Sequence, residues 1–341
     1  MSPAGSRPRA SKKPWARALL GVLIVILAAL VGTGIWLSLP TEKVPIARLL
    51  PSSPFAYFTV KLDRDDPAIK GIVTALKGKL GAAGGFFKRQ ALNIILPAAL
   101  PPSVSVAAAS DTGSGEASLV VYADMGRLSK VLRLGGSSVA GRLLRGQGPV
   151  VRELADGRAV WSRSPGKGPV SFSAYTIIGG TLVLGTGRSA VIDVCALYAG
   201  KGAPDARRDA WGVALARATS MRGAYLYADN REGALSRIVN GATAKYSFAA
   251  FPSIDAVSAI SGSITLLETA VSGKLDFASS SKNRAEAISS DVLFIYGAVK
   301  RVARSAGIRM QGEIETKDGG LSFSFSLPGY MEALSASEKK Q

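Results

Sequence analysis

The chain of 341 residues contains no histidine and a single cysteine. The missing imidazole excludes Ser-His-Asp and Cys-His nucleophiles, histidine-liganded zinc sites and the usual general base near neutral pH. One cysteine, Cys195, cannot form a disulfide within the chain. Its neighbours Val191, Ile192, Val194 and Leu197 indicate an apolar helix face, which predicts a buried, unreactive thiol. We therefore expect no enzyme, no cofactor and no metal site.

Acidic residues are also scarce, since 24 Asp and Glu stand against 42 Lys and Arg and leave a net charge of +18. Residues 1–17 carry five basic residues and no acid. Such a surplus favours anionic neighbours, namely lipid headgroups, acidic glycans or nucleic acid, without choosing among them. A codon bias toward Arg and Ala explains the composition equally well. The basic residues after residue 17 are scattered, so we expect no nucleic-acid partner.

One long apolar run, residues 18–39, carries no charge. Roughly 20 apolar residues span the hydrocarbon core of a bilayer, and Trp15 and Trp36 fall near the two ends, where indoles favour the interface. The basic cluster before the run predicts a cytoplasmic N-terminus. A cleaved signal peptide is the alternative, but its apolar region is typically about 7–15 residues long. The sequence predicts a transmembrane helix in the bacterial inner (cytoplasmic) membrane and a periplasmic ectodomain.

The rest of the chain divides by composition into a linker and an ectodomain. The expected parts are a basic cytoplasmic tail (1–17), the transmembrane helix (18–39), a linker (40–54), a first α+β subdomain (55–155), a second α+β subdomain (156–328) and a polar C-terminal tail (329–341).

Within the ectodomain, strand patterns alternate with helical ones, which predicts an α+β fold of repeated ββα(β) units with a mainly antiparallel sheet. A strand (55–61) and a helix (65–80) precede these units. The units are expected at 103–109, 117–122, a helix from about 126 and 150–154; at 170–178, 181–184, 189–199 and 224–229; and at 261–267, 270–278, 283–305 and 307–316, closed by a strand at 321–327.

A Tyr-Ala-Asp triplet ends two of the predicted strands, at Asp124 and at Asp229. In both places a helix is expected to follow, where a carboxylate satisfies free N–H groups. We interpret both acids as caps rather than catalytic groups.

The stretch GTGRSA at residues 185–190 resembles the start of a dinucleotide-binding unit. That unit needs a parallel strand before the glycines and a second strand ending in an acid about 20 residues later. Here Gly179-Gly180 makes the preceding strands a hairpin, and Asp205 lies in a polar, proline-containing segment. We interpret the stretch as a glycine turn, with anion binding at the helix start beside Arg188 as the alternative.

Two further patterns have chemical potential but simpler explanations. Ser-x-x-Lys, in which a lysine can activate a serine, occurs at 164–167, 279–282 and 337–340; a helix-capping Ser280 or Ser281 is the favoured explanation for the second. Asp63, Asp65 and Asp66 lack calcium-loop spacing and are expected at a helix start.

The segment 69–100 combines apolar residues with Lys and Arg and has no acid, a composition typical of helices that lie in a membrane interface. A helix packed on its own sheet is the alternative that we favour. If the segment binds a ligand or the outer leaflet, the residues expected to do so are Ile69, Ile72, Val73, Leu76, Lys77, Phe86, Phe87, Lys88 and Arg89.

Four stretches of the ectodomain, LLPSSPFAYFTVKLD, YTIIGGTLVLGTGRSAVID, SSSKNRAEAISS and MQGEIETKDGGLSFSFSLPG, resemble a bacterial family of membrane-anchored extracytoplasmic domains of unknown function. The resemblance covers most of the ectodomain and implies an α+β fold. It implies no activity and no site residues.

These observations predict a non-catalytic binding or scaffold protein of the cell envelope. Its expected partners are membrane lipid, through the transmembrane helix, and an anionic lipid, an envelope glycan or another envelope protein. A carrier or chaperone for an apolar ligand is the first alternative, and a Ser/Lys hydrolase is the second. The oligomeric state is left open.

Overall fold

A computed structural model of the chain describes residues 39–51, 54–63, 65–66, 69–71, 101–110, 117–144, 146–166, 171–201, 208–221, 223–237, 240, 251–267, 270–305, 307–317 and 319–330. The chain divides into two compact units, Met1–Thr41 and Glu42–Gln341. Every helix and strand named below belongs to the second unit.

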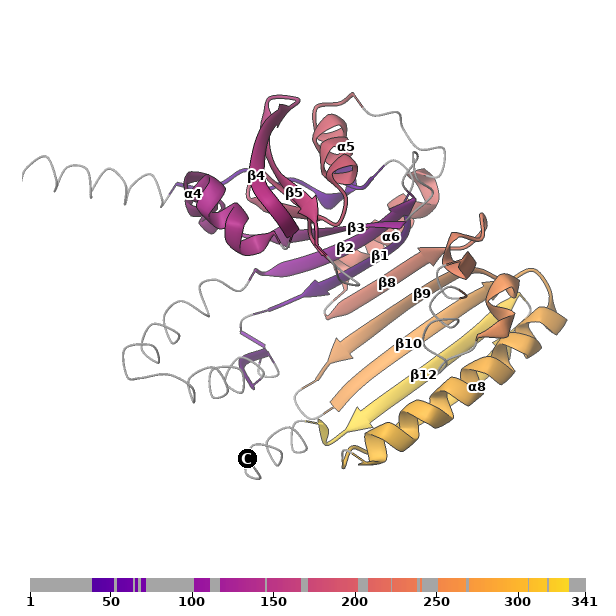
Figure 1. The fold of residues 1–341 in the computed structure, drawn as a ribbon. Helices are drawn as coiled ribbons and strands as arrows, with labels where there is room; N and C mark the ends of the chain where they lie inside the picture. The colour runs from indigo at the N-terminus through magenta and orange to yellow at the C-terminus, as the bar shows by residue number, and fades with distance from the viewer. Residues whose placement is uncertain are drawn as a thin grey trace, which may run out of the picture. The chain divides into compact units, whose positions relative to one another are not determined.

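The described strands form one 12-stranded sheet in which all neighbours pair antiparallel, in the order β11-β12-β10-β9-β8-β1-β2-β3-β7-β6-β5-β4. This confirms the α+β class with a mainly antiparallel sheet (Figure 1). The strands are β1 (Pro54–Lys61), β2 (Ser103–Ser110), β3 (Ala117–Asp124), β4 (Gly146–Ala155), β5 (Arg158–Pro165), β6 (Ala174–Ile178), β7 (Thr181–Gly185), β8 (Ala224–Asp229), β9 (Val257–Leu266), β10 (Ala270–Ser279), β11 (Gln311–Lys317) and β12 (Gly320–Pro328).

The helices of the described part pack on this sheet. They are α4 (Leu128–Leu143), α5 (Arg188–Tyr198), α6 (Arg208–Ser220) and α8 (Lys282–Ser305), with short 3-10 turns η1 (Ile46–Arg48) and η2 (Pro252–Ala256). Helix α5 contacts β3, β6 and β7, whereas α8 runs along β10 and β12 (Figure 1). The two helices therefore cover different stretches of one sheet.

Side chains along each strand point alternately toward the core and away from it. The alternation of apolar residues in the sequence therefore predicts strands. In β3, Ser118, Val120 and Tyr122 are buried while the residues between them are half-buried. A large core gathers around Tyr122, Val183 and Val191 under α5. A second core, including Phe277 and Ile288, lies between α8 and the strands β10 and β12.

Three hairpins followed by helices occur in the expected order, as β2–β3–α4, β6–β7–α5 and β9–β10–α8. The strand that follows each of these helices does not complete a self-contained repeat. In the described pairings, β4 pairs with β5, β8 joins β1 to β9, and β11 pairs with β12. Each return strand thus extends the common sheet without pairing with the hairpin of its own unit.

Strand β5 and helix α6 are not among the elements predicted from the sequence. The turn before β5 is formed by Asp156 (φ 49°) and Gly157 (φ 75°), and Asp-Gly is the dipeptide that the tightest hairpins prefer. The expected boundary between two subdomains, at residues 155–156, falls in this turn, and β4 and β5 pair on either side of it. The division into subdomains stays a prediction.

The predicted transmembrane helix, residues 18–39, lies outside the described residues except for Leu39. Among the helices that the structure describes, none has both the length and the apolar character to cross a bilayer. The membrane anchor therefore remains a prediction from sequence.

Candidate functional site

Helix α4 breaks in its middle, at Gly135-Gly136. Gly136 has φ 40° and ψ −118°, far from helical values. Only glycine adopts such angles at low cost, because it has no Cβ. A Cβ on Gly136 would also lie 3.1 Å from Cζ2 of Trp161. The backbone break and the indole ring thus require glycine at this position.

The break is held by an aromatic side chain from the sheet. The hydroxyl of Tyr175, on β6, donates a 2.9 Å hydrogen bond to the carbonyl oxygen of Gly136. Tyr175 is buried, and burial raises the pKa of its hydroxyl to about 12. The phenol therefore stays neutral and remains a donor throughout the physiological pH range.

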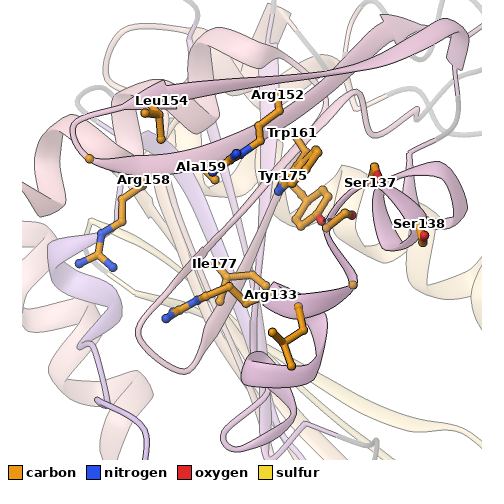
Figure 2. A pocket seen from close by; sticks show the side chains of 14 residues that line it. Arg133, Ser137, Ser138, Arg152, Leu154, Arg158, Ala159, Trp161, Tyr175 and Ile177 are labelled. Atoms are coloured by element: carbon orange, nitrogen blue, oxygen red, sulfur yellow. Dashed lines mark hydrogen bonds between the residues drawn. The ribbon is translucent and has the colours of Figure 1, made fainter.

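A cavity of about 650 Å³ opens between the break in α4 and the strands β4, β5 and β6. Figure 2 shows Arg152, Trp161 and Tyr175 close together in it, with Arg133 and Ile177 below them. The cavity is lined by Arg133, Leu134, Gly135, Gly136, Ser137, Ser138, Arg152, Leu154, Gly157, Arg158, Ala159, Trp161, Tyr175 and Ile177. We call it the arginine cavity.

Three arginines from three different elements are among the residues that line the arginine cavity, and the guanidinium of each contacts a neutral group. Arg133, on α4, donates to the carbonyl oxygen of Gly179 at 3.2 Å. The guanidinium of Arg152 lies 5.6 Å from the centroid of Trp161, on the face of β5 that packs on α4. The guanidinium of Arg158 lies 4.9 Å from the centroid of Tyr198 on α5, so it is directed to the opposite face of the sheet. The rings fix the positions of these two cations without neutralising them.

The acids nearest in sequence to these arginines have other partners. Glu153 pairs with Arg188, and Asp156 pairs with Lys201 at 2.6 Å. None of the lining residues named above is an acid, and in the part of the chain that the structure describes the observed ion pairs do not involve Arg133, Arg152 or Arg158. The arrangement offers an excess of hydrogen-bond donors to an oxyanion. Its lining contains no side chain that titrates near neutral pH.

The glycine stretch at residues 185–190 is a turn, as interpreted from the sequence. Strand β7 lies antiparallel to both β3 and β6, so no parallel βαβ unit begins here. A Cβ on Gly185 would lie 2.6 Å from Cγ2 of Val191, so this glycine permits α5 to pack closely on its strand. Arg188 pairs with Glu153 through its Nε and Nη2, and anion binding beside it stays a prediction. Asp205 lies outside the described residues.

The two Tyr-Ala-Asp triplets do place a carboxylate on free N–H groups. Asp124 accepts from the N–H of Gly126 at 3.1 Å, and Asp229 accepts from the N–H of Arg231 at 3.0 Å. In both places the N–H group belongs to the second residue after the acid, which makes an Asx turn. The prediction that Asp124 caps the following helix is wrong, because the N-cap of α4 is Arg127 and no side chain caps it. Asp229 is also buried and ion-paired with Arg231.

The serine and aspartate patterns have local structural roles where they are described. The Oγ of Ser279 donates to the carbonyl oxygen of Ser281, and the Oγ of Ser281 accepts from the N–H of Arg284 at 3.4 Å. Ser281 thus caps α8. The carboxylate of Asp63 accepts from the N–H of Asp65 at 3.0 Å, as expected before a helix. Among the described residues no group of acids or thiols has a metal-binding arrangement.

Cys195 is buried in the core under α5, as predicted. Burial is the main cause that raises the pKa of its thiol, partly offset by a hydrogen bond with Thr176. The thiolate, which is the reactive form, is therefore disfavoured.

Of the predicted ligand-binding residues, only Ile69 is described, and it is buried with a relative exposure of 5%. The other predicted residues, Ile72, Val73, Leu76, Lys77, Phe86, Phe87, Lys88 and Arg89, lie outside the described residues. Their proposed role stays a prediction.

The arginine cavity is not predicted by the sequence. The available signals were two adjacent glycines inside a helical pattern, Gly135-Gly136, and the hairpin pair Asp156-Gly157. Neither signal shows that Arg133, Arg152 and Arg158 line the same space, because that depends on which strands become neighbours.

No known family profile matches the chain, and no curated protein matches it. Among solved structures, it is similar to crystal form III of TP0453, with 10% sequence identity over 87% of this chain and 99% of that one and a TM-score of 0.45. Crystal form IV of TP0453 matches with 12% identity over 89% and 99% of the two chains and a TM-score of 0.43. These are distant likenesses of fold, and nothing about function is drawn from them.

Proposed function

We propose that this chain is a single-pass, membrane-anchored binding protein of the bacterial cell envelope. Its extracytoplasmic unit binds an anionic envelope component, a sugar acid or a sugar phosphate, in the arginine cavity. The observation that supports the proposal is one open space lined by Arg133, Arg152 and Arg158, with no acid among the residues named in its lining.

An oxyanion suits these groups because a guanidinium presents planar, paired donors that match a carboxylate or a phosphate. Arg152 already lies against the ring of Trp161, so fewer of its rotamers are lost when the ligand binds. No described ion pair has to break before the ligand enters. Each charge-assisted hydrogen bond is worth about 1.5–3 kcal/mol.

A ring-bearing ligand suits the rest of the lining. Trp161 and Tyr175 provide an aromatic wall, and the hydroxyls of Ser137 and Ser138 lie at the exposed end of the site. A volume of about 650 Å³ falls within the range of small-molecule sites, about 300–1,000 Å³. An open site with polar and aromatic walls fits a sugar better than an acyl chain.

The proposed location rests on the sequence. Residues 18–39 are long and apolar enough to span the bilayer, and the basic residues before them favour a cytoplasmic N-terminus. A periplasmically active reporter fused to the C-terminus is expected to be active. A reporter that is active only in the cytoplasm would contradict this topology.

Binding is tested by calorimetric titration of the full chain in an uncharged detergent. The probes are digalacturonic acid, glucose 1-phosphate and the neutral disaccharide maltose. The proposal expects heat from at least one acidic probe and none from maltose, and the two acidic probes distinguish a carboxylate from a phosphate. No heat from either acidic probe, or equal affinity for maltose, contradicts it.

A carrier for an apolar ligand is the second candidate. A smaller cavity, of about 270 Å³, lies between η1, β1 and α6, and its lining includes Val44, Ile46 and Leu215. Displacement of a fluorescent fatty-acid probe tests this candidate, and a probe that does not bind the full chain removes it.

A further inference from the structure

Helix α8 has one face that is committed to the core of the protein. Ala285, Ile288 and Val292 are buried, and α8 contacts the strands β10, β11 and β12 and the turn η2. Spacings of three and four residues keep these side chains on one side of the helix. This face accounts for the packing of α8 on the sheet.

A second set of apolar residues on α8 is turned to solvent. Leu293, Phe294 and Val302 have relative exposures of 53%, 62% and 69%. Phe294, Ala298 and Val302 are four residues apart and therefore form a line along the helix. We call Leu293, Phe294, Ala298 and Val302 the apolar stripe. No helix packing described above requires large apolar side chains on this side.

Cations cluster beside the apolar stripe. Lys300, Arg301 and Arg304 are exposed in the last two turns of α8, and Arg309 is exposed just beyond them. A cavity of about 450 Å³ is lined by Lys300, Arg304 and Arg309 together with Gly307, Ile308, Met310 and Gln311. Basic residues at a helix C-terminus also stabilise the helix dipole, but that effect does not explain the exposed aromatic and aliphatic side chains next to them.

The acids of α8 do not balance these cations. Asp291 is engaged, since it accepts a 2.8 Å hydrogen bond from the N–H of Ser253. Glu286 is exposed, but it lies in the N-terminal half, away from the basic end. The C-terminal half of the exposed side is thus apolar and cationic.

We propose that the exposed side of α8 lies on an anionic membrane surface. The apolar stripe enters the boundary between headgroups and acyl chains, and the cavity lined by Lys300, Arg304 and Arg309 holds a lipid phosphate. A helix with an apolar side and flanking cations is suited to this position, and each cation adds to its attraction to anionic lipid. A second copy of the chain fits less well, because it would place the same cations against one another.

This contact is distinct from the arginine cavity, although it rests on the proposed location at the membrane. A membrane anchor at residues 18–39 would tether the unit that begins at Glu42 close to the bilayer. The tether raises the effective concentration of lipid at α8, so even a weak surface contact would be populated.

The experiment uses the full chain with Phe294→Cys, labelled with an environment-sensitive fluorophore at this exposed position. The matched control is Glu315→Cys on the edge strand β11, which is also exposed. Each labelled protein is reconstituted into vesicles of phosphatidylcholine alone or with phosphatidylglycerol. We expect a blue-shifted emission, quenched by a lipid-borne quencher, at position 294 in the anionic vesicles and not at position 315.

A second variant separates charge from label effects. Lys300→Ser together with Arg304→Ser is expected to weaken the anionic-lipid response, by about fivefold in partitioning for each charge removed. An unshifted emission at position 294 in anionic vesicles overturns the proposal. A shift that persists in detergent and grows with protein concentration also overturns it, because a second copy then covers the stripe.

Flotation of the same samples distinguishes the anchor from α8. A chain that floats with both kinds of vesicle, but whose label at position 294 is unshifted, has an anchor and refutes only the α8 contact. A chain that floats only with anionic vesicles supports the α8 contact and refutes the anchor. A chain that floats with neither refutes both.

Discussion

The hydroxyl of Tyr175 donates a 2.9 Å hydrogen bond to the carbonyl oxygen of Gly136, at the point where helix α4 breaks. This contact ties the helix to strand β6 and shapes one wall of the arginine cavity. The hydrogen bond, the glycine and the neighbouring arginines can each be tested separately.

Gly136→Ala is expected to lower the free energy of unfolding, for two reasons. The positive φ at this position is unfavourable for alanine, and the added Cβ would be in close contact with the ring of Trp161. The cost of such a backbone position is about 1–3 kcal/mol. Chemical denaturation of the full chain in detergent measures it. Gly141→Ala is the matched control on the same helix, since a Cβ there meets open space; it should be neutral or stabilise by up to about 1 kcal/mol. Equal effects of the two changes would contradict the role of the break.

Tyr175→Phe removes the donor to Gly136 and is expected to cost about 1 kcal/mol of unfolding free energy. Its pH dependence is a sharper test. Because burial raises the pKa of Tyr175 to about 12 from an ordinary value of 10, the folded state holds the phenolic proton more tightly than the unfolded state. The contribution of Tyr175 is fully present below about pH 10 and is lost as the pH rises toward 12. The stability difference between the native chain and Tyr175→Phe should therefore shrink over that range, and a constant difference would contradict the assignment.

Arg152→Gln is expected to lower the affinity for the acidic probe about 10- to 100-fold, since one charge-assisted contact is lost. The unfolding free energy should change little because Arg152 is exposed. Arg142→Gln is the control. Arg142 is also exposed and lies in the last turn of α4, but it does not line the arginine cavity. Calorimetric titration of both variants gives the comparison. An unchanged affinity in Arg152→Gln would remove this arginine from the site.

Ser281→Ala tests whether the serine before α8 serves as a cap. Its Oγ accepts from the N–H of Arg284, and loss of a cap costs about 1 kcal/mol. Ser290→Ala, at an exposed position inside the same helix, should cost less. Thermal unfolding of the two variants measures the difference.

Labelling of the native chain by a serine-reactive probe, lost on Ser279→Ala, would instead support the hydrolase alternative.

Cys195 should react with maleimide only when the protein unfolds, because burial both shields the thiol and raises its pKa. The measurement is the labelling rate at neutral pH with and without denaturant. Rapid labelling of the folded chain would show that the core around Cys195 opens.

Local patterns predicted much of the fold. The alternation in residues 117–124 and the Gly179-Gly180 turn mark strands that are present, and the helix at 282–305 was expected within one residue at its start. Helix α6 was missed even though its buried residues Trp211, Ala214 and Ala218 have helical spacing, because the polar segment before it suggested a loop.

The candidate site could not be predicted in the same way. Arg133 and Arg158 are 25 positions apart in sequence, and both line one cavity only because α4 breaks and β5 pairs between β4 and β6. Sheet order is set by contacts between distant segments, and no local pattern encodes it. The apolar stripe on α8 could not be predicted for a related reason. Apolar residues on a helix usually pack in the core, and only the structure shows that Ala285, Ile288 and Val292 form the buried face instead.

The binding proposal depends above all on the combined charge of Arg133, Arg152 and Arg158. Calorimetric titration of the full chain with the acidic probe, before and after all three arginines are changed to glutamine, tests it. We expect the native chain to bind and the triple variant to show no heat while its unfolding midpoint stays within a few degrees. Equal affinity in the two proteins would show that the ligand, if it binds, binds elsewhere.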